Sequence, residues 1–381
     1  MKSYKPLFSK SLASIPAHLH ATAHSHHLRP DVTLAAQIKC QEDAFALADR
    51  KWEKIFGGVY PSAQAHAARL LNTGEPDDIV FAVNTHEFLV RLLSCLPTGR
   101  PAKILTTDGE FHSASRQFRR LEEAGLAAIT RIATEPFTDF PARFTAALKN
   151  DCDMVFFSHA FFNSGFIVPD LSAIIRAVKN PETLVVVDGF HSFMAFPVDL
   201  AAIKNRAFFM AGGYKYAMTG EGACFLHCPP GYGARPVNTG WFAGFSEMTN
   251  PSKNKVFYSA DASRFAGATM EPSGIYRFNA VMDMLQNEKI EAREIHHRVK
   301  NLQALFLNAL PKKLADALMT IGWHGNFLTF RTAAAGEIHD KLMEADLYTD
   351  YRDDRLRFGF GIYHDPEDMD KMAGVVKRAL A

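Results

Sequence analysis

The sequence predicts an α/β protein with three layers around a mostly parallel sheet, followed by a smaller α+β domain. Two observations favour this fold. Short apolar runs alternate with helical patterns up to about residue 212, and most of these runs are apolar throughout, as in a sheet covered on both faces. From about residue 275 the pattern changes to long helices with short strands between them.

The expected elements follow in chain order. A helix is expected to begin at Asp31 as its N-cap and to end at Gly57 and Gly58. Residues 223–228 follow the preceding strand too closely for a crossover helix, so we expect antiparallel neighbours there. A final helix is expected from Asp365 and Pro366. The other expected strands are 79–83, 103–107, 127–133, 154–158, 183–188 and 207–212, with helical patterns between most of them.

Composition sets limits on function. The chain has 381 residues, of which 48% are hydrophobic, and a net charge of +1, as in a globular protein with a large core. The interspersed charges give no basic surface for nucleic acid. We find no apolar run long enough to span a membrane or to form a secretory signal. The five cysteines are scattered, which indicates no disulfides and a cytoplasmic enzyme.

Residues with useful chemistry follow the expected strands at their carboxyl ends, where open α/β sheets bind ligands. Lys215 is the first candidate, because the ammonium group of a lysine at the buried end of a strand must be desolvated or paired. The alternative for Lys215 is a surface lysine in a glycine-rich turn, which the presence of Asp188 makes less favourable. The residues at the strand ends are Thr85, His86, Phe111, Asn163, Asp188, His191, Tyr214 and Lys215.

These residue types fit pyridoxal 5′-phosphate (PLP). A lysine amine can form a Schiff base with PLP, and an aspartate such as Asp188 can keep the pyridine nitrogen protonated. A helix beginning at Thr85 and His86 can accept a phosphate on its free N–H groups. The aromatic ring of Phe111 can stack on the cofactor. The strand ends therefore predict a PLP site.

The sequence also resembles a known family at these positions. VVVDGFHSFMAFPVDL, followed by GGYKYAMTGEG, is similar to the cofactor region of fold-type I PLP enzymes of the class V aminotransferase superfamily. TGWFAGF (239–245) and DYRDDRLRFGFGIYHDPEDM (350–369) resemble the kynureninase-like branch. The resemblance runs from about residue 79 to the end of the chain. It implies a large PLP-binding domain (51–270), a small C-terminal domain (271–381) and an N-terminal segment (1–50) at the cleft edge and in dimer contacts.

The resemblance also implies residue roles. Lys215 would carry the Schiff base and move the α-proton of an amino-acid substrate. Asp188 would pair with the pyridine nitrogen, and Arg357 would hold the substrate carboxylate, in competition with Arg352 and Arg355 for that role. A homodimer with shared active sites is implied. The other implied cofactor contacts are Thr85, His86 and Tyr214 at the phosphate, His191 at the phenolic oxygen, Phe111 and Trp241 near the ring, and Thr269 at the partner's phosphate.

The N-terminal histidines raise the question of a metal. His20 and His24 have helical spacing, but we find neither an HExxH motif nor a nearby acid or cysteine to complete a ligand set. The sequence therefore predicts no metal site. We expect this segment to lie across the cleft entrance, where His24 or Ser25 contacts the substrate.

The reaction stays open at this stage. Kynureninases have an acid where this chain has Ala114, and Gly-Asn-Ser-Leu-Gly where it has residues 23–27, positions expected in or near the substrate pocket. We therefore favour a class V aminotransferase over kynureninase-type hydrolysis, with amino-acid epimerisation and a non-enzymatic binding module as further alternatives. A cysteine desulfurase fits poorly, because its nucleophilic cysteine lies on a C-terminal loop, and the last cysteine here is Cys228.

Overall fold

A computed structural model describes residues 2–148, 151–247, 254–320, 322 and 324–380. Its main sheet has seven strands in the order β1-β7-β6-β5-β4-β2-β3. All pairs from β6 to β3 are parallel, and β7 is antiparallel to both of its neighbours, which confirms the expected pairing of β6 with β7. The strands are β1 (Ile79–Ala82), β2 (Ala102–Thr107), β3 (Ala127–Ile132), β4 (Met154–Ser158), β5 (Leu184–Asp188), β6 (Ala207–Gly212) and β7 (Cys224–His227).

Helices cover both faces of this sheet, as the apolar strands predict. Val186 packs in one core cluster with side chains of α5 (Thr85–Leu93) and α6 (His112–Glu123). Val187, its neighbour on the same strand, packs in the other cluster. That cluster includes side chains of α4 (Tyr60–Leu70), α7 (Phe140–Ala147), α8 (Leu171–Ala177) and α9 (Ser273–Asn287). Alternate residues therefore point to opposite faces, and the predicted three-layer fold is confirmed.

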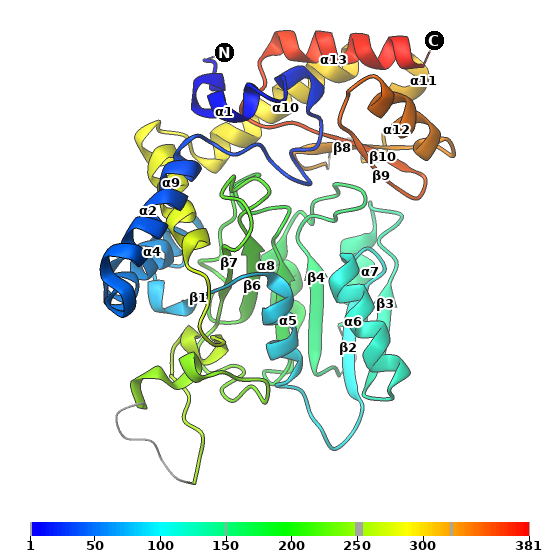
Figure 1. Cartoon of the computed structure of the whole chain (residues 1–381). Helices are drawn as coiled ribbons and strands as arrows, with labels where there is room; N and C mark the ends of the chain where they lie inside the picture. The colour runs from blue at the N-terminus through cyan, green and yellow to red at the C-terminus, as the bar shows by residue number, and fades with distance from the viewer. Residues whose placement is uncertain (1, 149–150, 248–253, 321, 323, 381) are drawn as a thin grey trace.

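A smaller α+β unit lies over the carboxyl ends of the strands, at the top of Figure 1. Its antiparallel sheet has the order β8-β10-β9, with β8 (Phe327–Arg331), β9 (Asp350–Arg352) and β10 (Arg355–Gly359). The N-terminal segment, with α1 (Ser9–Leu12), joins this unit, since Ala21 bonds through its backbone to Tyr348 and Gly359 at 2.9 and 2.7 Å. The helices of the unit are α10 (Ala292–Ala309), α11 (Lys312–Ala315), α12 (Ala335–Glu344) and α13 (Pro366–Ala379).

The expected end of the first long helix is wrong. The helix α2 (Val32–Leu47) breaks at Ala48, whose φ is 48°, and a helical path continues through α3 (Lys51–Lys54) and a π-helical turn (Ile55–Val59) into α4. Gly57 and Gly58 therefore lie inside a helical run. Glycine costs only about 1 kcal/mol in a helix, and burial of the apolar face of α4 outweighs that cost. The predicted start is confirmed, since Asp31 is the N-cap residue of α2, although its carboxylate accepts from Ser9 and Lys10 rather than from the helix.

The loop that carries Lys215 is held by close backbone packing. A Cβ at Gly213 would lie 1.9 Å from the Thr219 hydroxyl oxygen. Further along the loop, a Cβ at Gly274 of α9 would lie 2.4 Å from the carbonyl oxygen of Gly222. The absence of side chains at these glycines lets α9 press the loop against the sheet.

We expect Gly274→Ala to lower the free energy of unfolding by about 1–3 kcal/mol, because the added methyl forces the backbone of Gly222 away. Urea unfolding measures this change. Gly58→Ala is the matched control, since a Cβ at Gly58 meets nothing within 4 Å. Equal effects of the two substitutions would contradict the packing argument.

Candidate active site

The carboxyl ends of β4, β5 and β6 bring the predicted residues together. Asp188 ends β5 and pairs in register with Ser158 of β4, and its Oδ1 accepts from the Phe190 N–H at 2.9 Å. Lys215 follows β6, and its Nζ lies 2.5 Å from Nε2 of His191. The aromatic rings of Phe190, Phe111 and Tyr214 surround the Nζ atom at 5.0, 5.5 and 5.8 Å.

Burial sets the charge of Lys215. It lowers the pKa of the amine to about 7, with Arg357 lowering it further and Asp188 opposing the shift. Burial also lowers the pKa of His191 well below its usual value, and the charge of Lys215 adds to this. His191 is therefore neutral at neutral pH, while Lys215 divides between its charged and neutral forms. Such an amine can both accept and return a proton.

The start of α5 lies next to the lysine loop. Asn84 caps the helix through its Oδ1, which accepts from the Glu87 N–H at 3.0 Å. The backbone N–H groups of Thr85 and Gly213 both approach the buried thiol of Cys224, whose pKa burial raises to about 12. The N–H groups in the first turn of a helix have no partner within the helix. The helix start at Thr85 and His86 can therefore accept a phosphate.

Several buried polar atoms near this site have no hydrogen-bond partner within the described residues. They include Nδ1 of His191, Oδ1 of Asn163 and Nδ1 of His159. Buried polar groups are normally paired, so these atoms are suited to a polar ligand. Together with the buried amine of Lys215 and the carboxylate of Asp188, this set of donors and acceptors fits PLP.

The predicted carboxylate-binding arginine already has a partner. Arg357 is 2% exposed, and its Nε and Nη2 donate to Asp350 of β9 at 2.7 and 2.6 Å. Its Nη1 donates to the carbonyl oxygen of Phe162. Burial alone would raise the pKa of Asp350. His24 and Arg357 lower it by more than burial raises it, so the pKa of Asp350 lies well below its ordinary value. Asp350 is thus ionised and bound to Arg357.

His24 reaches this pair from the N-terminal segment, as the sequence leads us to expect of a residue at the cleft. Its buried ring stacks on Phe327 at 4.6 Å, and its Nε2 lies 3.9 Å from Oδ1 of Asp350. Burial lowers its pKa to about 4, so His24 is neutral at neutral pH. Ser25 is half-buried, and the one side-chain contact found for it within the described residues is with His26, at 3.4 Å.

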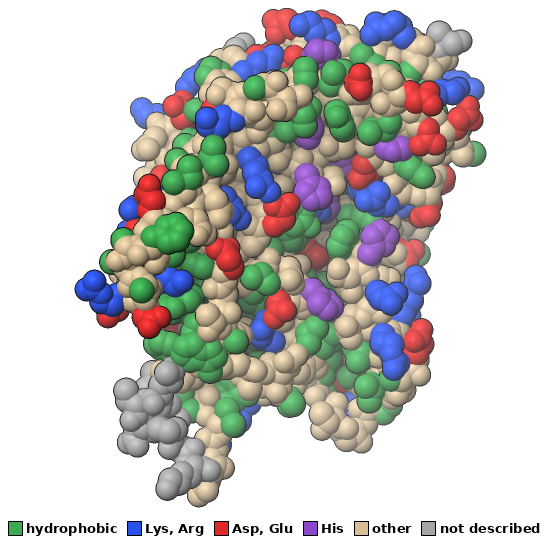
Figure 2. Space-filling view, in the orientation of Figure 1, with side chains coloured by type: hydrophobic (Ala, Val, Ile, Leu, Met, Phe, Trp, Pro, Cys, Tyr) green, Lys and Arg blue, Asp and Glu red, His purple; other side chains and the backbone are tan. Residues whose placement is uncertain are grey.

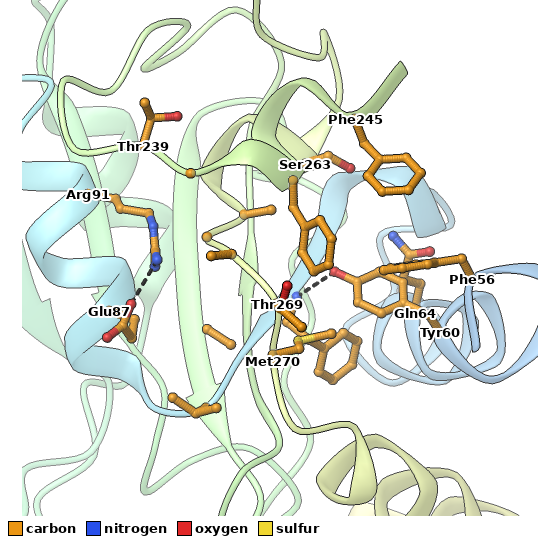
Figure 3. Close-up of a pocket in the computed structure, with 18 of the residues that line it drawn as sticks. Phe56, Tyr60, Gln64, Glu87, Arg91, Thr239, Phe245, Ser263, Thr269 and Met270 are labelled. Carbon is orange, nitrogen blue, oxygen red and sulfur yellow. Dashed lines mark hydrogen bonds and ion pairs between the residues drawn. The ribbon is translucent and has the colours of Figure 1, made fainter. Parts of the chain in front are cut away.

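Trp241 and Thr269 lie at or beside a cavity of the main unit. Thr269 lines a cavity of about 610 Å³ with Phe56, Tyr60 and Met270 (Figure 3). Trp241 is 45% exposed and packs against Phe242 beside that cavity. Within the described residues, neither side chain has a recorded contact with Lys215, so their predicted cofactor roles stay predictions.

The expectation that Ala114 lies in or near the substrate pocket stays a prediction. Ala114 is 4% exposed and packs in the core cluster between α6 and the sheet, with Phe118 and Ile104. Phe111 precedes the helix and contacts the Lys215 region, whereas the helical turn that follows directs position 114 towards the sheet. Phe190 and Tyr214, whose rings face Lys215, belong to the same cluster, so the burial of Ala114 does not exclude a place near the site.

Two acids in or near the site were not singled out from the sequence. Asp350 could have been found from the alternating acids and bases of DYRDDRLR, which suggest cross-strand ion pairs. Glu110 has no comparable signal. It is buried and accepts from the hydroxyls of Thr107 and Ser158, both at 2.6 Å. Burial raises its pKa to about 8, and the charge of Asp188 adds to the shift.

Metal sites and membrane-spanning helices are two further features that bear on function. Within the part of the chain that the structure describes, we find no group of three or more His, Cys, Asp or Glu side chains able to hold a metal ion. Among the described helices, none is both long enough and apolar enough to cross a bilayer. Histidine side chains are visible on the face where the small unit meets the main sheet (Figure 2).

We expect Asp350→Asn to lower the free energy of unfolding at pH 7 by about 3 kcal/mol, because it leaves the guanidinium of Arg357 without its counter-ion. The pKa of Asp350 is lower in the folded protein than its ordinary value of about 3.9. Its contribution is thus complete above that value and falls as the pH drops towards the folded pKa. Denaturant unfolding at pH 7 and pH 3 should show a smaller difference at pH 3.

Asp354→Asn is the control for this experiment. Asp354 is 48% exposed and lies 3.3 Å from Arg331, so its loss should change stability by less than about 0.5 kcal/mol. A loss at Asp350 no larger than this, or one that grows at pH 3, would contradict a buried ion pair.

Known proteins resemble this chain in fold over nearly its whole length. A complex of the cystine C–S lyase C-DES with its product cysteine persulfide has a TM-score of 0.81 at 17% identity, covering 97% of this chain and 99% of the lyase. A C-DES variant with glycine covalently linked to its PLP cofactor also has a TM-score of 0.81, at 18% identity, covering 98% and 99%. Apo cysteine desulfurase from Thermococcus onnurineus NA1 has a TM-score of 0.78 at 16% identity, covering 99% and 98%.

The sequence comparisons agree with this fold. A probable cysteine desulfurase from Vibrio cholerae serotype O1 is 20% identical over 296 residues, which are 73% of this chain and 71% of that protein. The family model for class-V aminotransferases matches residues 34–319, well over half of the chain. The chain therefore belongs to the class-V aminotransferase family of PLP-dependent enzymes.

Proposed function

We propose that this PLP-dependent enzyme acts on an L-amino acid, that Lys215 removes and returns the α-proton, and that the overall reaction is transamination. The observation that carries the proposal is the buried amine of Lys215, 2.5 Å from His191 and with a pKa of about 7. An acid–base group with a pKa near the working pH transfers protons most effectively in both directions.

The residues around Lys215 have distinct tasks. Bound PLP supplies an electron sink for the charge that develops when the α-proton leaves. Asp188 would keep the pyridine nitrogen protonated, and the start of α5 at Thr85 and His86 would hold the phosphate. Phe111 and Phe190 exclude water from the amine. Lys215 then holds the proton that it takes from the amino acid.

Transamination needs one group that takes a proton from one carbon and gives it to another. Lys215 can do both at neutral pH. Elimination or hydrolysis also needs a proton donor for a leaving group or a base for water. His24 and His191 beside the site are neutral near pH 7, because burial lowers the pKa of both. Neither histidine is thus a ready proton donor, which counts against an elimination that must protonate a leaving group.

A C–S lyase is the second candidate, since the solved structures reported above include a cystine C–S lyase of the same fold. A reaction that forms a persulfide on a C-terminal cysteine of the enzyme is not supported, because the last cysteine is Cys228, and it is buried. Kynureninase-type hydrolysis stays a further alternative, less favoured because Ala114 and residues 23–27 depart from the kynureninase motifs. Amino-acid epimerisation is the fourth candidate reaction, and no particular residue of the site favours it.

The test begins with the cofactor. We expect borohydride reduction of the PLP-loaded protein to fix PLP on the peptide that contains Lys215, as read by mass spectrometry. Lys215→Ala should remove this adduct. Incubation with a panel of amino acids should then give the corresponding keto acid without ammonia, because a transaminase keeps the amino group on its cofactor.

Lys300→Ala is the matched control for the adduct, since burial also lowers the pKa of Lys300, to about 8. It should leave the adduct on Lys215 intact. An adduct that persists in Lys215→Ala would refute the assignment of the lysine. Release of ammonia with sulfide would favour the C–S lyase, and anthranilate from kynurenine would favour the hydrolase.

We further propose a homodimer with shared sites, in which Thr269 faces the partner's cofactor. The surface beside the cavity of Figure 3 exposes apolar side chains, among them Trp241, Phe245 and Val83. Exposed apolar patches of this kind mark association surfaces. Sedimentation should show a dimer, and Phe245→Lys should shift it to monomer. A parent protein that sediments as a monomer would count against shared sites.

A further inference from the structure

A closed circuit of side-chain contacts begins and ends at the amine of Lys215. On one side, its Nζ atom lies 5.5 Å from the ring of Phe111, which meets the ring of Phe162 edge to face at 5.4 Å. On the other side, Nζ lies 2.5 Å from Nε2 of His191, whose ring is 5.4 Å from that of Phe327. Two phenylalanine rings, Phe162 and Phe327, thus lie one residue away from the reacting lysine.

Arg357 closes the circuit, three contacts away from the amine in either direction. Its Cζ atom lies 5.9 Å from the ring centres of both Phe162 and Phe327. Its charge is balanced, because Nε and Nη2 donate to Asp350, while Nη1 donates to the carbonyl oxygen of Phe162. Among the six members of the circuit, all of which the structure describes, the amine of Lys215 is therefore the one charge without a bonded counter-ion.

The circuit bears on the substrate side chain, because that side chain is bonded to the carbon from which Lys215 takes a proton. An acidic or basic side chain in this place would lose its water and find no unpaired opposite charge except the reacting amine itself, which is unfavourable. An aromatic side chain would instead pack against phenylalanine rings in the edge-to-face or offset arrangements that aromatic pairs prefer.

Phe162 is the ring of the circuit best placed to meet a ligand. Phe327 is completely buried, and the ring of His24 is stacked on it at 4.6 Å. Phe111 is expected to stack on the cofactor. Phe162 is 7% exposed, and its ring lies 5.1 Å from the ring of His112, which is an exposed residue. A ligand that enters from solvent past His112 therefore meets Phe162 before it reaches Arg357.

We propose that the substrate is an L-amino acid with an aromatic side chain, and that Phe162 selects this side chain. The inference rests on the proposed function, since it concerns the amino acid on which Lys215 acts. An aromatic pair contributes to binding beyond the area that it buries, so Phe162 favours a ring over an aliphatic chain of similar size.

The test uses three carboxylates that lack an amino group and so do not react: 3-phenylpropionate, propionate and glutarate. Each is titrated calorimetrically into the PLP-loaded protein. The three probes share one carboxylate, so differences between them report the rest of the molecule. 3-Phenylpropionate should bind at least about tenfold more tightly than propionate, because its phenyl ring leaves water. Glutarate should bind no more tightly than propionate, because its second carboxylate loses water without a counter-charge.

Substitutions of Phe162 test whether this ring carries the preference. Phe162→Ala should lower the affinity for 3-phenylpropionate relative to propionate by about threefold to tenfold, as expected for the loss of an aromatic pair. Phe162→Tyr should keep the preference, because it keeps the ring. Phe162→Leu retains the apolar bulk without the ring and should lose part of the preference. All three substitutions leave the carbonyl that bonds to Arg357 in place, and Phe162→Leu carries the test if Phe162→Ala does not fold.

Phe137→Ala is the matched control, because Phe137 is also a partly buried phenylalanine in a ring pair, stacked on Phe166 at 4.9 Å, and it lies outside the circuit. It should retain the full preference. Tighter binding of glutarate than of 3-phenylpropionate, an unchanged preference in both Phe162→Ala and Phe162→Leu, or an equal loss in Phe137→Ala would overturn the proposal. The adduct on Lys215 is measured separately in each variant, so a lost preference with an intact adduct is distinct from failure of the proposed function.

Discussion

The desolvation of one amine governs the rest of this site. Lys215 is 5% exposed, and holding a charged ammonium in such a place is unfavourable unless it is paired or made neutral. The protein lowers its pKa to about 7 and opposes the shift only in part through Asp188. His191 stays neutral beside it, so the pair carries no second buried cation. The reactivity of the amine is thus a direct result of where the chain buries it.

That burial depends on the sheet. Asp188 and Lys215 follow neighbouring parallel strands, so their side chains emerge at the same edge. The loop after Lys215 can return to the sheet as β7 only because α9 packs directly on its backbone at Gly222. The small unit then closes the site from the opposite side with Phe327, which contacts both His24 and His191. Residues from the two ends of the chain are thereby fixed around one amine.

The ion pair between Arg357 and Asp350 shows how a buried acid neutralises a basic side chain. The buried guanidinium of Arg357 is rigid, and its charge is balanced by the bound carboxylate of Asp350. The more exposed guanidinium of Arg352 has no acid of its own that balances its charge fully. Asp350 therefore neutralises the buried charge of Arg357 within the β9–β10 hairpin. Residue type at a motif position does not reveal this, because the partner comes from an adjacent strand.

Local patterns were sufficient to predict much of this protein. The apolar strands, the antiparallel return at β7 and the strand-end residues Asp188, His191 and Lys215 could all be read from the sequence, since a period of two residues and a parallel order fix where side chains emerge. The helical path through Gly57 and Gly58 could not, because tertiary burial overrides a weak local preference. The direction of Ala114 and the burial of Glu110 were likewise decided by packing between distant segments. Contacts of that kind depend on the whole fold, and no local pattern in the sequence encodes them.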